Sequence, residues 1–343
     1  PRPPADSDAL RCAQPHPSDN TSESELTPMT TAITSARTHW SGNRGYATLV
    51  LIAATVIWGS TFAVVDYVVH TVPVHRFLAI RFIIALVCLL AVRPRALRGL
   101  SKQTWRRGII IGIALGIGYF LQTQGQDLGT VPTVAAFITG LFVVLTPLLA
   151  AWWFKTHIGP VAWVSIAIAT IGLAGLTLKG GRIDTGAIYV LGCALAFAIQ
   201  IVLLARWSTP ATTVSLVAIQ ILVTAFGEII STSIFDGAPS ASSFNFGGGQ
   251  WLAIAFLAVF ATVVCFLAQT WAQGLMPATQ AAVIMTAEPL FATLTGTVLH
   301  ERITALQIGG GALVLAAMYI AELAPARLGG RESAEAALPH LEP

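Results

Sequence analysis

Residues 132–154 read PTVAAFITGLFVVLTPLLAAWWF and contain no charged side chain. A helix needs about 20 mainly apolar residues to cross the hydrocarbon core of a bilayer, so this segment is long enough to span a membrane. Nine other segments of the chain have the same character. The ten predicted spans cover residues 46–69, 74–92, 105–126, 132–154, 160–178, 186–206, 212–235, 250–271, 277–299 and 304–323. They predict an all-α integral membrane protein with ten transmembrane helices.

The overall composition argues against several other classes of protein. Hydrophobic residues make up 55% of the 343 residues and charged residues only 10%, with a mean hydropathy of +0.73. Soluble domains usually carry about 25% charged residues. The formal charge of +3 is too small for a face that follows nucleic-acid phosphates. An ordinary cytosolic enzyme, a disordered protein and a nucleic-acid binder are therefore excluded.

The residues that usually carry metal or redox chemistry are scattered. The four cysteines, Cys12, Cys88, Cys193 and Cys265, lie far apart and form no C-x-x-C motif. Three of them sit in apolar runs, where a thiol usually serves as a small hydrophobe. The histidines fall in loops and at span ends, without the spacing of metal ligands. We therefore expect no disulfide framework, metal site or cofactor, and no catalytic residues.

The distribution of Lys and Arg predicts the orientation in the membrane. Placing the loop between the second and third spans in the cytoplasm puts 12 near-membrane basic residues inside and 4 outside. Such a bias marks the cytoplasmic side. With ten spans both termini are then cytoplasmic, and we expect a multi-pass protein of the cell (inner) membrane. Residues 1–45 are predicted to be a disordered cytoplasmic tail and residues 324–343 a C-terminal tail.

The chain carries a weak internal repeat with an offset of 146 residues. Phe120-Leu121 then falls on Phe266-Leu267, and Ala135-Ala136 falls on Ala281-Ala282. The halves, residues 46–178 and 186–323, hold five predicted spans each. Because five is odd, the second half must be inverted relative to the first, as in many secondary transporters. The alternative is that two Ala- and Leu-rich strings agree by composition alone.

Glycines recur on one face of the third predicted span. Gly108, Gly112 and Gly116 are four residues apart, the spacing at which small residues let two membrane helices approach closely. No Gly-Lys-Ser/Thr sequence follows, so this is not a phosphate-binding loop. We expect a helix-packing face.

Several short motifs occur in order along the spans. They are residues 58–62 (WGSTF), 81–82 (RF), 122–125 (QTQG), 136–141 (AFITGL), 144–148 (VLTPL), 288–292 (EPLFA) and 300–304 (HERIT). With this order and spacing, residues 46–323 resemble the EamA-type branch of the drug/metabolite transporter (DMT) superfamily. The resemblance implies two inverted five-helix repeats and transport of small metabolites, often amino acids and related compounds, across the inner membrane.

Two positions depart from the family's pattern. Lys155-Thr156-His157 stands where the first repeat of many relatives has an exit of the Gly-Glu-Arg type, and Glu228 places an acid inside the seventh predicted span. Either departure could mark a subtype with its own ligand.

Glu288 is the strongest candidate for a functional residue. A charged group at the centre of a span costs about 2.5–3.5 kcal/mol, so ionisable residues there are candidates for function. Glu288 lies mid-span beside Pro289, which removes one backbone hydrogen bond. Loss of water favours the neutral form of a carboxylate, so Glu288 could bind a coupling proton or a substrate amine. The alternative is a structural acceptor at a helix kink.

Eight other residues are predicted to bind substrate. Trp58 could stack on an organic ligand or cation, and the remaining seven are polar side chains that need partners within the membrane. The eight are Trp58, Ser60, Thr61, Gln122, Gln124, Thr139, Gln200 and Gln269. The family resemblance places the spans of the glutamines and Thr139 around a central cavity. The alternatives are core packing for Trp58 and helix–helix hydrogen bonding for the polar residues.

Two further ionisable residues within spans have structural interpretations. Arg81 in the second span could extend to the outer headgroups or pair with Asp66 or Asp127. Glu228 is expected to pair with another group or to lie at the lipid interface.

These observations predict a secondary transporter that exports small metabolites, such as amino acids or related amphipathic compounds, by alternating access, with protons as a candidate coupling ion. The chain has no ATP-binding motif, so its energy would come from a gradient. The partners are the lipid bilayer and a small-molecule substrate. Two alternatives stay open at this point, namely a membrane-embedded enzyme and a passive permease or channel for small solutes.

Overall fold

The computed structural model describes residues 23–154, 160–179, 182–237, 244–276, 281, 284–285, 287–298 and 303–328. The chain divides into two units, residues 1–43 and 44–343. Helix α1, Glu23–Val69, begins well before the first predicted span. Residues 23–45, which we predicted to be disordered, are thus helical here. A transmembrane helix can be extended without a new nucleation cost, which accounts for the difference.

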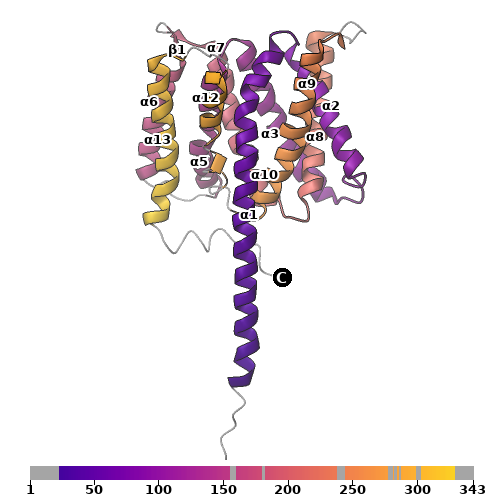
Figure 1. The fold of residues 1–343 in the computed structure, drawn as a ribbon, viewed down its shortest axis with the longest axis vertical. Helices are drawn as coiled ribbons and strands as arrows, with labels where there is room; N and C mark the ends of the chain where they lie inside the picture. The colour runs from indigo at the N-terminus through magenta and orange to yellow at the C-terminus, as the bar shows by residue number, and fades with distance from the viewer. Residues whose placement is uncertain are drawn as a thin grey trace, which may run out of the picture. The chain divides into compact units, whose positions relative to one another are not determined.

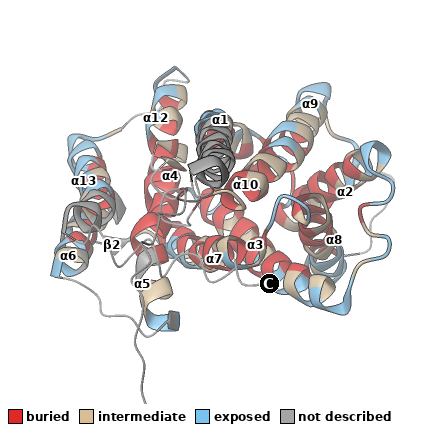
Figure 2. Ribbon diagram, turned by 90° about the horizontal axis from the view of Figure 1, so that it is seen from below, coloured by how far each residue is buried: buried red, intermediate tan, exposed pale blue. Residues whose placement is uncertain are grey.

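The second unit is a bundle of helices (Figure 1). After α1 come α2 (Val74–Val92), α3 (Lys102–Asp127), α4 (Pro132–Gly140), α5 (Phe142–Phe154), α6 (Pro160–Thr177), α7 (Thr185–Trp207), α8 (Thr213–Ser231), the π-helix η1 (Thr232–Asp236), α9 (Gly248–Phe256), the π-helix η3 (Leu257–Val264), α10 (Cys265–Gln273), α12 (Glu288–Val298) and α13 (Ala305–Leu328). In Figure 2, α3, α7 and α10 lie in the middle of the bundle, where buried residues concentrate.

Two short strands lie between α6 and α7. Strand β1 (Leu178–Lys179) pairs antiparallel with β2 (Arg182–Ile183). This two-residue ladder leaves the predicted all-α fold class unchanged. A reversal between two helices leaves backbone groups without helical partners, and the ladder pairs some of them.

Seven of the ten predicted spans are long and apolar enough to cross a membrane in the described part of the chain. They are Gly45–Val69, Val74–Val92, Lys102–Asp127, Pro132–Trp153, Thr185–Trp207, Thr213–Asp236 and Gly248–Gln273. The fifth and tenth predicted spans contain shorter apolar helices, Trp163–Gly175 and Ala305–Ile320. In the ninth, residues 277–299, positions 277–280, 282–283, 286 and 299 lie outside the described residues. The protein is a multi-pass helical membrane protein, and the count of ten stays a prediction.

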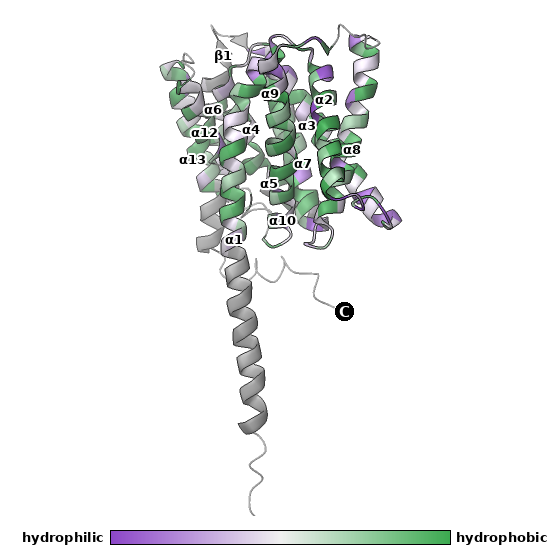
Figure 3. Ribbon diagram, turned by 45° about the vertical axis from the view of Figure 1, so that its right-hand side comes forward, coloured by the Kyte–Doolittle hydropathy of each residue, from purple (hydrophilic) through white to green (hydrophobic). Residues whose placement is uncertain are grey.

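The surface of the bundle matches a lipid environment. Large hydrophobic side chains are exposed on many helices, including Val87, Ile113 and Phe226. Figure 3 shows hydrophobic colour along most of the described helices, with hydrophilic residues mainly at their ends. In water such a surface would aggregate, whereas lipid tails solvate it.

The glycine face of α3 packs against α8, as predicted. A Cβ atom built on Gly108 would lie 2.7 Å from Ile219, and one on Gly112 would lie 2.9 Å from Val223 and 3.0 Å from the Cα of Gln220. Real Cβ contacts are essentially never shorter than 3.0 Å. The missing side chains therefore set the distance between these helices.

Gly112→Ala should destabilise the protein, since Val223 and the α8 backbone must move away from the new methyl group. Overpacking costs roughly 1–3 kcal/mol, against a gain in helix propensity of about 1 kcal/mol. The matched control is Gly227→Ala on α8, where nothing lies within 4 Å of the added Cβ. Thermal unfolding in detergent should show a lower Tm for the first variant only. An equal Tm for both would contradict the packing role.

Candidate functional site

A small cavity lies inside the bundle where six helices meet, and we call it the central cavity. Side chains from α1, α3, α5, α7, α10 and α12 line it. Its polar lining residues are Thr61, Tyr119, Gln122, Gln200, Gln269 and Glu288. Aromatic side chains, Trp58, Phe62, Phe142, Phe197 and Phe266, form much of the rest. A mostly apolar cavity with a few convergent polar groups is the usual form of a small-molecule site.

The central cavity is nearly closed in this conformation. Its volume is about 50 Å³, whereas sites for organic ligands measure roughly 300–1,000 Å³. A few water molecules fit, but an organic metabolite does not. Binding therefore requires the helices to move apart.

Six of the nine predicted site residues line the central cavity. They are Trp58, Thr61, Gln122, Gln200, Gln269 and Glu288. Their side chains come from five helices that are far apart in the sequence, so the fold brings them together.

The other three predicted site residues lie elsewhere. Ser60 donates a hydrogen bond to the Ile57 carbonyl on its own helix, at 2.7 Å. Gln124 donates to the Asp127 carboxylate at 3.1 Å. Ser60 lies two residues from both Trp58 and Phe62, and Gln124 lies two residues from Gln122. Two residues correspond to about 200° around a helix, so Ser60 and Gln124 point away from the face that lines the cavity. The prediction overlooked this helical phase.

Thr139 lies directly behind the cavity wall. Its hydroxyl accepts a hydrogen bond from the Gln122 amide at 3.3 Å, and the residue is buried. It is therefore a support for a lining residue, not a lining residue itself.

Glu288 begins α12 and has Pro289 in the same first turn. Proline is well tolerated there because the first turn needs no backbone donor, and a carboxylate at a helix N-terminus is favoured by the helix dipole. Ile284 and Met285 just before it are also helical, and Ala287 N–H bonds to the Ile284 carbonyl at 3.4 Å, so the interruption ahead of Glu288 is short, as at a kink. Glu288 is buried, and no described residue donates a hydrogen bond to its carboxylate.

Gln269 adds a second acceptor to the central cavity. Its amide nitrogen approaches only the sulfur of Met285, at 4.0 Å. Its Oε1 is buried and has no hydrogen-bond partner among the described residues. A buried acceptor without a donor is costly, and a ligand with N–H groups would satisfy it.

Gly59 places α1 directly against the start of α12. A Cβ on Gly59 would lie 2.6 Å from the Glu288 carbonyl oxygen and 2.6 Å from the Cβ of Phe291. The glycine of the WGSTF motif therefore allows the contact that holds Glu288 beside Trp58 in the cavity wall.

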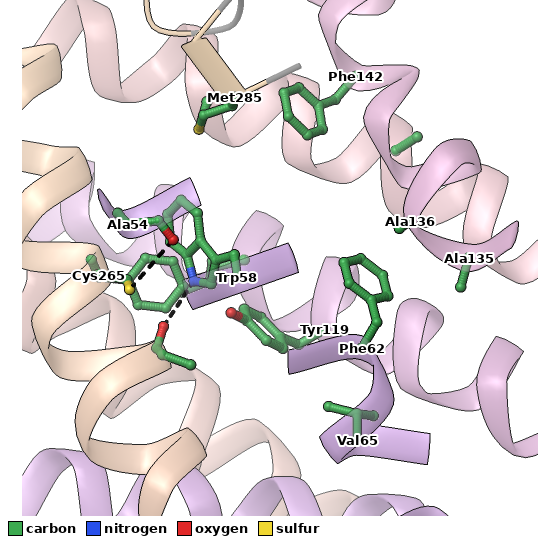
Figure 4. Close-up of a cluster of buried hydrophobic side chains, with 14 of the residues drawn as sticks. Ala54, Trp58, Phe62, Val65, Tyr119, Ala135, Ala136, Phe142, Cys265 and Met285 are labelled. Atoms are coloured by element: carbon green, nitrogen blue, oxygen red, sulfur yellow. Dashed lines mark hydrogen bonds between the residues drawn. The ribbon is translucent and has the colours of Figure 1, made fainter. Parts of the chain in front are cut away.

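Trp58 is fixed by the π-helix η3. Its indole Nε1 donates to the Ala261 carbonyl at 2.9 Å, and its ring lies 5.7 Å from that of Phe266. A π-helix spaces its backbone bonds differently from an α-helix and is often found at functional sites. Figure 4 shows Trp58 with this bond as a dashed line, among Phe62, Tyr119, Phe142 and Met285.

Tyr119, which lines the cavity, is not among the predicted site residues, and Arg81, which contacts Tyr119, was interpreted as a structural residue. Tyr119 lines the cavity four residues after Leu115 and three before Gln122, a helical spacing that could have revealed it. Arg81 is 1% exposed and contacts Tyr119 and Thr262. Its side chain does not extend to the headgroups and does not pair with Asp66 or Asp127. Arg81 lies seven residues, about 10 Å along the helix axis, after the start of α2.

Glu228 lies outside the central cavity. Its carboxylate is 2.9 Å from His75 Nδ1, and the His75 ring stacks on Phe120 and Phe235 at 4.8 and 5.2 Å. Both residues line a larger groove of about 1140 Å³ between α2, α3 and α8. Exposed Ile113, Ile117 and Phe226 also line this groove, so it lies on the outside of the bundle, and Gln124 lines it instead of the central cavity.

No group of three or more His, Cys, Asp or Glu side chains could hold a metal ion within the described residues. Cys88, Cys193 and Cys265 are free thiols. Cys12 and the Lys155-Thr156-His157 sequence lie outside the described residues.

A bundle of long apolar helices around a closed, partly polar cavity is the architecture of a membrane transporter. The sequence profile of the EamA-like transporter family matches residues 45–178 and 184–322. The chain therefore belongs to the EamA-like transporter family, within the DMT superfamily, as the motifs predicted. A membrane transporter implies a lipid bilayer and a small-molecule substrate as partners.

The relatives of known sequence are also described as transporters. An uncharacterized transporter of Archaeoglobus fulgidus is 32% identical over 82% of this chain and 87% of its own. The uncharacterized inner membrane transporter YedA of Escherichia coli is 28% identical over 72% and 80%. A protein of known crystal structure matches with a TM-score of 0.60, covering 83% of this chain and 99% of its own at 23% identity. This last likeness concerns the fold alone.

Gly59→Ala should reduce both stability and transport, because the new methyl group would push Glu288 and Phe291 away from α1. The cost is expected at roughly 1–3 kcal/mol. Gly45→Ala on the same helix is the control, since nothing lies within 4 Å of a Cβ there. Thermal unfolding and flux in proteoliposomes should separate the two variants. Equal behaviour of both would contradict the close α1–α12 contact.

Proposed function

We propose that this protein is a secondary transporter that exports small metabolites, amino acids and related amphipathic compounds, across the cell membrane by alternating access. The observation that carries the proposal is the central cavity. Three of its helices, α1, α3 and α5, come from the first half of the chain, and three, α7, α10 and α12, from the second. A cavity shared by two halves can open to either side when one half rocks on the other.

Two inverted five-helix repeats are part of this proposal. Helix α5 starts at Phe142 after a one-residue break, and α12 starts at Glu288 after a turn at Ala287. These two starts are 146 residues apart, the offset of the sequence repeat. Both first residues line the central cavity. The matching breaks and the separate match of the family profile to each half support the repeat.

Both breaks are locally tightened turns within a span. Leu141 keeps an αR backbone and its carbonyl accepts from Leu145 N–H, and Ala287 N–H bonds to the Ile284 carbonyl three residues earlier. A 3₁₀-type turn inside a helix often marks a functional hinge. Other helices pack closely against the turn before α5, since a Cβ on Gly140 would lie 2.8 Å from Met318 and 3.2 Å from Pro289. Pro289 follows the turn before α12, so the two turns lie next to each other near the cavity.

Glu288 is the proposed coupling residue. Its carboxylate and Gln269 Oε1 are acceptors without donors among the described residues. A carboxylate away from water binds either a proton or an organic ammonium group. If the two compete for Glu288, the entry of protons drives the exit of substrate. The excess of Lys and Arg on one side supports cytoplasmic termini.

Exchange in proteoliposomes tests the proposal. Vesicles loaded with a mixture of unlabelled amino acids should take up the labelled compounds by saturable counterflow, which a channel would not show. Glu288→Gln should lower flux driven by a pH gradient about tenfold or more, because the carboxylate contacts are lost. Thermal unfolding should show that the variant is folded.

Glu228→Gln is the matched control, because Glu228 is a buried carboxylate outside the central cavity. Its pH-driven flux should stay close to that of the wild type. Unchanged flux in Glu288→Gln at every pH would contradict proton coupling through Glu288. Uptake that never saturates would instead indicate a passive permease.

A further inference from the structure

A buried arginine lies behind the central cavity, and no acidic side chain in the described part of the chain pairs with it. Arg81 is the largest of the fully buried side chains in the described part of the chain. A cation at this depth in a membrane protein is expensive and usually marks a functional site.

The groups that hold Arg81 are neutral. Its Nε donates to the Thr262 hydroxyl at 3.0 Å, and its Nη2 donates to the Tyr119 hydroxyl oxygen at 3.4 Å. The guanidinium carbon lies 4.6 Å from the centre of the Tyr119 ring. The positive charge of Arg81 therefore lies against Tyr119, and no described carboxylate neutralises it.

Thr262 fixes the arginine in place. While it accepts from Arg81, its own hydroxyl donates to the Leu257 carbonyl five residues earlier, at 2.9 Å. This bond belongs to the wide turns of η3, so the same π-helix that holds Trp58 also orients Arg81. The guanidinium has little freedom to swing into the cavity itself.

Tyr119 lies between Arg81 and the central cavity. Its ring is clamped edge-on by Phe82, Phe197 and Phe266, at 5.2–5.9 Å, and the residue lines the cavity. Because its oxygen accepts from Arg81, its proton must point elsewhere, and no described residue accepts it. A hydroxyl that receives a charged donor becomes a stronger donor.

We propose that Tyr119, positioned and polarised by Arg81, forms a subsite for the carboxylate of a zwitterionic substrate. The inference rests on the proposed function and deepens it. Glu288 and Gln269 Oε1 offer the acceptors for an ammonium group in the same cavity. One donor backed by one cation suits a monovalent carboxylate better than a phosphate dianion, which needs several donors. The site thus requires both charges of an α-amino acid.

The test compares each amino acid with its carboxamide, which keeps the ammonium group and the size but loses the negative charge. Thermal stabilisation of the purified protein is measured with L-leucine and L-leucinamide, and with L-phenylalanine and L-phenylalaninamide, because a ligand of the folded state raises its stability. In the wild type the acid should bind about tenfold more tightly than the amide or better.

Tyr119→Phe keeps the ring packing and removes only the hydroxyl, so the preference for the acid should disappear. Tyr67→Phe is the matched control, since Tyr67 is exposed on α1 and outside the cavity. Arg81→Lys keeps a positive charge but should reduce the ratio of acid to amide affinity. A purely structural role for Arg81 or Tyr119 would weaken acid and amide alike and leave their ratio unchanged.

Equal binding of acid and amide to the wild type would overturn the subsite, as would a preference that survives in Tyr119→Phe. Stabilisation by neither member of either pair would also overturn it. In that case counterflow of other metabolites decides whether the proposed transport function stands without this subsite.

Discussion

The lack of water inside the bilayer governs this structure. A polar group in the membrane interior must find its partner within the protein or in a ligand. The long apolar helices satisfy their own backbones, and many buried hydroxyl groups bond to a carbonyl one turn earlier, as Thr55 and Thr146 do. Several polar side chains that are not satisfied in this way line the central cavity, among them Gln269 and Glu288. These groups are available to a ligand that enters it.

The π-helix η3 organises the wall of that cavity. Its Ala261 carbonyl receives the Trp58 indole and its Thr262 hydroxyl receives Arg81. Close glycine contacts complete the arrangement, with Gly59 against α12 and the α3 glycines against α8. Rigid contacts of this kind favour motion of whole helices over local deformation. The small volume of the cavity, about 50 Å³, fits this close packing.

Much of this could be predicted from sequence because membrane helices are simple to recognise. Uncharged runs such as residues 132–154 predicted the seven spans that the structure describes, and the four-residue spacing of Gly108, Gly112 and Gly116 predicted a packing face on α3, although not that α8 is its partner. Glu288 and Gln269 could be chosen because polar groups are rare in such runs. These inferences used only length, polarity and periodicity.

Other features depend on details that hydropathy does not carry. Ser60 and Gln124 were chosen by type without regard to helical phase, so they point away from the residues beside them. The role of Arg81 required its depth in α2 and the position of Thr262, which is 181 residues away. The π-helix leaves no recognisable pattern in an apolar sequence.

The wide turns of η3 also make the length of this segment important. A π-helix accommodates an additional residue relative to an α-helix, so loss of one residue between Leu257 and Val264 would let the segment relax to α-helical turns. The deletion would be absorbed in the turns themselves, and α10 would keep nearly the same orientation about the helix axis. If η3 instead became α-helical with all its residues retained, everything after it would rotate by about 100°, and Gln269 would leave the cavity although no cavity residue had been replaced. The wide turns of η3 therefore decide which face of α10 lines the cavity.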